Sequence, residues 1–227
     1  MRSSVTAERP KSEFQSIKHT GLENIKMKIN LQKVGDQHKI DLSKGKANIT
    51  VNANLNWNQT VQVQKGFLGS IFGGGSDSPD LDLGCMYEMQ NGNKNVIQPL
   101  GKNFGSKSQE PYVFLDKDDR DGGSNDGENM FVYKPELVKR VMFFAFIYKG
   151  APNFQSVGGK MTFKISNGEV ITLSLNNPDS SSTFCAAALF ENKNGDYFLT
   201  KEERYFRGHQ LADAHYKFGF NWTAGSK

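Results

Sequence analysis

The chain has 227 residues, with 28 lysines and arginines against 24 aspartates and glutamates, which gives a formal net charge of +4. This length suffices for one sizeable core or two small ones. No apolar run approaches the roughly 20 residues that a membrane-spanning helix requires. The excess lysines are scattered and lack the arginine and aromatic stripe of nucleic-acid binders, so no nucleic acid is expected as a partner.

The composition also bears on organisation and compartment. Residues 1–26 are polar without a sustained period, which predicts a disordered or loosely attached tail before a single domain over residues 27–227. The first residues lack the apolar core of a secretory signal. Cys85 and Cys185 lie in apolar, strand-like runs and are too few for a disulfide framework. These features predict a cytoplasmic protein with two buried free thiols.

Alternating apolar and polar residues predict short strands throughout the domain. The alternation is strict over residues 49–57, and residues 141–148 form the most apolar run, which predicts a central strand. Asn-Gly and similar turn signals predict three hairpins, at residues 90–93, 167–168 and 194–195. A short helix is predicted at residues 209–215 and a last strand at 218–222. Roughly ten strands at this spacing predict an all-β fold, a two-sheet antiparallel β-sandwich with one or two short helices.

The most unusual stretch is residues 115–129, which read LDKDDRDGGSNDGEN. It holds five aspartates and one glutamate, relieved only by Lys117 and Arg120, in a chain that is otherwise basic. Carboxylates at this density repel one another unless a cation holds them, and hard oxygen ligands on a Gly-rich loop suit Ca²⁺. Apolar runs hold both ends of the loop. The pattern therefore favours a metal site over a solvated acidic turn.

Two further aspartates, Asp80 and Asp82, stand at the entrance of a predicted strand. Residues two apart in a strand point to the same face. Two carboxylates on one face are costly unless they are paired or bound to a metal, so these residues are natural partners of the acidic loop. In the alternative interpretation, Asp80 is a turn residue after Pro79 and only Asp82 is special.

Several kinds of chemistry are disfavoured. The acidic loop is not an EF-hand, because counting from Asp116 places Asp121 at position six and Gly127 at position twelve, where Gly and Glu are required. The sequence has no P-loop and no zinc-type Cys/His spacing. A hydrolase built on Asp82 and Asp119 is disfavoured, because crowded acids suit cation binding better than acid–base work. A non-enzymatic role is predicted.

A Gly/Ser-rich loop at residues 64–79 carries four large apolar side chains, Phe67, Leu68, Ile71 and Phe72. Such a loop either docks onto its own domain or offers an apolar surface to a partner.

Several separate blocks of the sequence resemble the TerD family of tellurium-resistance and stress-response proteins, closest to its TerA-like branch. The blocks are NLNW (54–57), GFLGSIFGGG (66–75), DLDLGC (80–85), GKNFGS (101–106), PYVFLDKDDRDG (111–122), GEN (127–129), FFAFIYKGAPN (143–153) and the ending RYFRGH…W-TAGSK. The likeness extends from about residue 27 to residue 227.

The resemblance implies a β-sandwich that binds calcium through acidic loops at one end. The implied ligands are Asp80, Asp82, Asp118, Asp119, Asp126, Glu128 and Asn129, with Asp116 and Asp121 as candidate helpers. The last block reads N-D-G-E-N-M where many family members read G-D-G-D-D-E. With fewer acids, one of two calcium sites is weaker or absent.

The resemblance further implies a cytoplasmic, calcium-binding, non-enzymatic protein of tellurite resistance and the stress response. Calcium is expected to order the acidic loops, which then dock other proteins of the tellurite-resistance system, including a membrane-associated complex. The apolar loop is a candidate contact. The rival hypothesis is a redox or oxyanion-handling enzyme that uses Cys85 or Cys185, and a fast-reacting thiol would support it. A nucleotide-binding module rests only on fold analogy.

Overall fold

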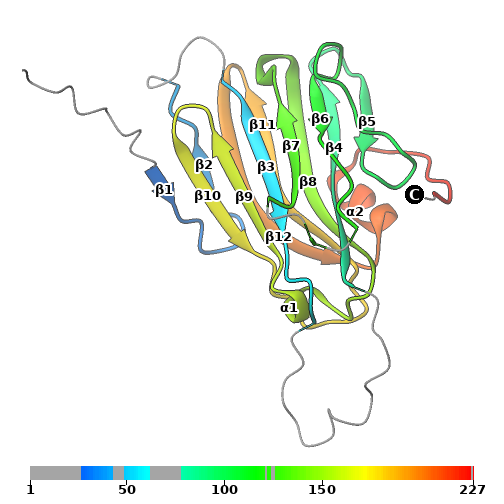
Figure 1. Ribbon diagram of the computed structural model, residues 1–227. Coiled ribbons are helices and arrows are strands. Elements are labelled where there is room, and N and C mark those ends of the chain that lie inside the picture. The colour runs from blue at the N-terminus through cyan, green and yellow to red at the C-terminus, as the bar shows by residue number, and fades with distance from the viewer. Residues whose placement is uncertain (1–26, 43–48, 62–77, 121, 124–125, 226) are drawn as a thin grey trace, which may run out of the picture.

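The chain folds into two six-stranded β-sheets that pack face to face (Figure 1). The computed structural model describes residues 27–42, 49–61, 78–120, 122–123, 126–225 and 227. The strand order of the first sheet is β1 (Met27–Ile29), β10 (Glu169–Ser174), β9 (Lys160–Ile165), β3 (Val51–Asn56), β7 (Glu128–Val132) and β6 (Val113–Leu115). The strand order of the second is β2 (Gln37–Lys39), β12 (Asp196–Phe206), β11 (Phe184–Lys193), β8 (Val138–Lys149), β4 (Asp80–Met89) and β5 (Lys94–Ile97). The predicted β-sandwich is confirmed.

The described residues also form short helical segments, among them η2 (Pro135–Leu137), α1 (Phe154–Val157) and α2 (His209–Tyr216). The segment α1 lies at one end of the sandwich, and α2 lies on the outer side of the second sheet (Figure 1). The predicted helix at residues 209–215 is confirmed as α2. None of the helices in the described parts of the chain is long and apolar enough to cross a membrane.

Apolar side chains form two cores on the two faces of the second sheet. The larger core fills the space between the sheets, where alternate residues of β3 (Val51, Ala53 and Leu55) are fully buried. The smaller core lies on the outer face of the second sheet, under α2, and includes Met86 and Phe144. Strands β4 and β8 are therefore buried on both faces, which explains why residues 141–148 form a continuous apolar run instead of alternating.

The structure corrects two expectations. First, β1 pairs with β10 in parallel, so the sandwich is not entirely antiparallel. Second, residues 218–222 form no strand. The carboxylate of Asp213 accepts hydrogen bonds from the backbone amides of Gly219 (2.7 Å) and Phe220 (2.8 Å). Because a side chain satisfies these amides, the segment needs no neighbouring strand.

Two predictions concern parts of the chain that lie outside the described residues. These are the tail at residues 1–26 and the apolar loop that carries Phe67, Leu68, Ile71 and Phe72. Both stay predictions.

Candidate metal centre

Acidic side chains converge at the end of the sandwich where β4 and β7 begin and β6 and β8 end. Asp80 and Asp82 occupy the first residues of β4, and Asp118 lies in the loop that follows β6. Each of these three carboxylates offers one oxygen, and the three atoms lie within 4.8 Å of one another. The fold therefore brings together three of the seven implied ligands. We call Asp80, Asp82 and Asp118 the acidic centre.

The acidic centre is poorly compensated by hydrogen bonds. Asp80 is 1% exposed and Asp82 is 0% exposed. Among the described residues, Asp82 Oδ2 and Asp80 Oδ2 have no hydrogen-bond partner. Burial raises the pKa of Asp80, and it raises the pKa of Asp82 to about 7. Unsatisfied, buried, hard oxygen atoms are the donor set that Ca²⁺ takes, so these residues fit the predicted ion.

A cationic side chain, Lys227, lies where the three carboxylates converge. Its ammonium nitrogen Nζ is 2.8 Å from Asp80 Oδ1, 2.5 Å from Asp82 Oδ1 and 3.0 Å from Asp118 Oδ1. The side chain of Lys227 is 4% exposed, and its Nζ lies 4.4 Å from the ring centroid of Tyr148. Sequence reasoning missed Lys227, because no local pattern connects it to residues about 110 and 145 positions away.

Glu128 connects the acidic centre to both sheets. It is fully buried at the start of β7. Its Oε2 accepts a hydrogen bond from the amide of Leu83 (2.6 Å), and its Oε1 accepts one from the amide of Asp119 (2.8 Å). Strand β5 pairs with β4 only from Cys85 onward, so no residue of β5 accepts a hydrogen bond from the amide of Leu83. The carboxylate of Glu128 accepts it instead. Burial raises the pKa of Glu128 well above its usual range, and the neighbouring carboxylate of Asp82 adds to this shift.

Three other predicted ligands, Asp116, Asp126 and Asn129, form a separate hydrogen-bonded group. The carboxylate of Asp116 accepts bonds from the backbone amide (2.8 Å) and the side-chain amide (3.1 Å) of Asn129. Asp126 Oδ1 lies 2.6 Å from Lys117 Nζ, and the side chain of Asp126 is 71% exposed. These contacts hold the two ends of the acidic loop close to each other. Their role as metal ligands stays a prediction, and Asp121 lies outside the described residues.

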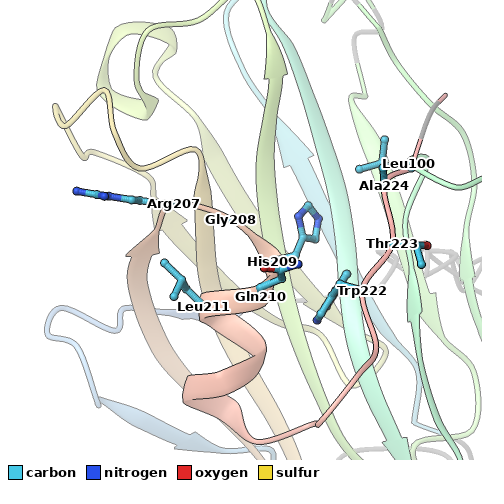
Figure 2. Close-up of a pocket in the computed structure, with 10 residues that line it drawn as sticks. Leu100, Arg207, Gly208, His209, Gln210, Leu211, Trp222, Thr223 and Ala224 are labelled. Carbon is cyan, nitrogen blue, oxygen red and sulfur yellow. The ribbon is translucent and has the colours of Figure 1, made fainter.

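A hollow of about 420 Å³ lies between α2 and residues 222–225 (Figure 2). His209 lies beside Trp222 at its border, with ring centroids 5.2 Å apart. The imidazole Nε2 is 2.8 Å from Gln98 Oε1, and burial lowers the pKa of His209 to about 4. The described residues that line the hollow include no carboxylate and no thiol.

Both cysteines are buried, free thiols, as predicted. Burial raises the pKa of each thiol. Redox chemistry needs a reachable thiolate, so the rival redox hypothesis loses its physical basis.

We expect Cys85 and Cys185 to react with a chromogenic disulfide reagent at least about 100-fold more slowly in the native protein than in denaturant, because neither thiol reaches solvent. The time course of thiol release at pH 8 measures this difference. A cysteine that reacts within seconds in the native protein would restore the redox hypothesis.

The fold and this centre define a two-sheet β-sandwich with a buried cluster of carboxylates at one end. No family model matches the chain. Over 206 residues, it is 36% identical to the tellurium resistance protein TerA of Alcaligenes sp., a match that covers 88% of this chain and 60% of that protein. This match supports a TerA-like family of tellurium-resistance proteins, as the sequence blocks predicted, and the chain spans about 60% of the length of this relative.

Proposed function

We propose that the chain is a calcium-binding, non-enzymatic protein of tellurium resistance, and that the acidic centre holds the ion. One observation carries this proposal: the two carboxylate oxygen atoms Asp80 Oδ2 and Asp82 Oδ2 are buried without a hydrogen-bond partner in the described structure. Such atoms are rare in native proteins unless a ligand satisfies them. The ligands supplied by the acidic centre are oxygen atoms only, which favours Ca²⁺ over zinc.

Calcium would act on this end of the sandwich by neutralising the carboxylates and fixing the loop that carries Asp118. The loop is already tied to β4 through the two hydrogen bonds of Glu128. An ordered loop presents one surface to partners, whereas a loop of repelling carboxylates samples many. We propose that this surface docks other proteins of the tellurium-resistance system in the cytoplasm, including a membrane-associated complex, with the loop of Phe67, Leu68, Ile71 and Phe72 as a candidate contact. The name of the TerA relative supports this setting.

The metal-stripped protein is expected to bind Ca²⁺ saturably and to melt at a higher temperature when calcium is added. A ligand that binds only the native state at 100 times its Kd stabilises it by about 2.7 kcal/mol. For a chain of this size, that energy raises Tm by roughly 5–10 °C. Calorimetric titration and melting curves with calcium or with chelator measure both quantities.

Magnesium at matched concentration provides the control, because it prefers a stricter octahedral shell and keeps its water. The absence of both heat and a shift in Tm with calcium would overturn the proposed function. The acidic loop would then be a charged turn tied by its own hydrogen bonds.

A further inference from the structure

Residues 222–225 and Lys227 are held at two points. At one, Trp222 Nε1 donates a hydrogen bond to Asp213 Oδ2 (2.9 Å). At the other, Lys227 Nζ lies among the carboxylates of the acidic centre. Between them the backbone passes close to Leu100, because a Cβ at Gly225 would lie 3.1 Å from Leu100 Cγ. Lys227 is therefore a second point of attachment for residues 222–225, which lie on the outer side of the second sheet.

The contacts of Lys227 involve oxygen atoms that a bound cation would need. The ammonium group of Lys227 faces all three carboxyl groups, and the exposed guanidinium group of Arg120 lies 3.0 Å from Asp118 Oδ2. Two positive charges therefore face three negative ones when all three carboxyl groups are ionised. Three oxygen atoms lie within 3.0 Å of Nζ, one from each aspartate. A Ca²⁺ ion brings two charges and takes roughly six to eight oxygen ligands. Because Nζ already contacts one oxygen atom of each aspartate, the ammonium group and the ion cannot both occupy the point of convergence.

We propose that Lys227 is an internal cation that holds the acidic centre together in the metal-free protein and is displaced when a divalent cation binds there. This inference rests on the proposed calcium function, and it adds that Lys227 competes with the metal ion for the carboxylates. Displacement releases one of the two points that hold residues 222–225 and Lys227. Trp222, Thr223, Ala224 and Gly225 form one wall of the hollow beside α2 (Figure 2). Metal binding at the end of the sandwich thereby changes the surface next to α2.

If Lys227 competes with the ion, its removal lowers the stability of the metal-free protein but raises the calcium affinity. This combination distinguishes a competitor from a merely structural ion pair. In the metal-free protein Lys227 compensates buried carboxylates, so its removal lowers stability. In the presence of calcium its displacement is part of the binding equilibrium, so its removal raises apparent affinity. A structural ion pair that stays in place during binding would lower stability when removed without raising affinity.

The test compares Lys227→Gln with Lys164→Gln, a matched change at an exposed lysine of β9 in the first sheet. We expect Lys227→Gln to melt at a lower temperature in chelator and to bind calcium roughly tenfold more tightly by calorimetry, a coupling of ordinary size. We expect Lys164→Gln to match the unaltered protein in both measurements.

Hydrogen exchange of the unaltered protein adds a measurement that needs no substitution. Calcium is expected to speed amide exchange at residues 223–225, and Lys227→Gln is expected to show the faster exchange without calcium. If the unaltered protein and Lys164→Gln bind calcium normally but Lys227→Gln binds it equally well or more weakly, the proposed competition is wrong. The proposed calcium function would then still stand. Binding by none of the three would overturn the calcium function itself, and the competition with it.

Discussion

Replacing Asp82 with asparagine is expected to weaken calcium binding by about 100-fold or more, because calcium affinity varies over several orders of magnitude with the charge of its ligands. Asp82 is the most buried member of the acidic centre, and its Oδ2 lacks a hydrogen-bond partner among the described residues. The change keeps the shape of the side chain and removes one buried charge. The metal-free protein is therefore expected to keep its Tm or to gain stability. Calorimetry and melting curves in chelator report the two effects.

Asp126→Asn is the informative comparison, because Asp126 belongs to the same predicted ligand set but has a side chain that is 71% exposed and paired with Lys117. Exposed ion pairs contribute little, so we expect calcium affinity to change less than about threefold. Equal losses from Asp82→Asn and Asp126→Asn would show that the ion is held by the wider acidic loop. The present assignment to the buried centre would then be wrong.

The strands could be predicted from the sequence where burial alone decides the structure. The strict alternation over residues 49–57 reports one buried face of β3, and the continuous apolar run at 141–148 reports the two buried faces of β8. The same reasoning failed at residues 218–222, where Phe218 and its neighbours also alternate. Period two shows that one side of a segment packs on a core, but it does not show which groups satisfy its amides. In this segment Asp213 satisfies two of them, from a helix that precedes it.

The acidic centre could be predicted only in part, for a related reason. Strand geometry places Asp80 and Asp82 on one face, and this local rule held. The loop offered many carboxylates at equal density, and composition could not tell that Asp118 turns inward whereas Asp126 is largely exposed. Lys227 comes from a distant part of the chain, and only the packed fold places its ammonium group among the carboxylates.

Glu128 has two candidate roles at the acidic centre, as a metal ligand and as a hydrogen-bonding link between the two sheets. The resemblance to tellurium-resistance proteins implies that it is a calcium ligand. In the structure both of its oxygens accept hydrogen bonds, one from the amide of Leu83 in β4 and one from the amide of Asp119 in the acidic loop. It therefore links the first sheet, where it resides, to the second sheet and to the loop that carries Asp118. The two roles make different predictions.

If Glu128 is this link, Glu128→Ala leaves two amides without an acceptor in the protein interior. Each such group costs about 1–3 kcal/mol, so we expect the free energy of unfolding in chelator to fall by roughly 3 kcal/mol, measured by urea denaturation. Glu136→Ala, at an exposed glutamate of η2, should change it by less than about 0.5 kcal/mol. Calcium affinity should also fall in Glu128→Ala, because the loop loses its position. Loss of calcium binding with unchanged metal-free stability would mean instead that Glu128 serves as a ligand, and that its two hydrogen bonds are dispensable.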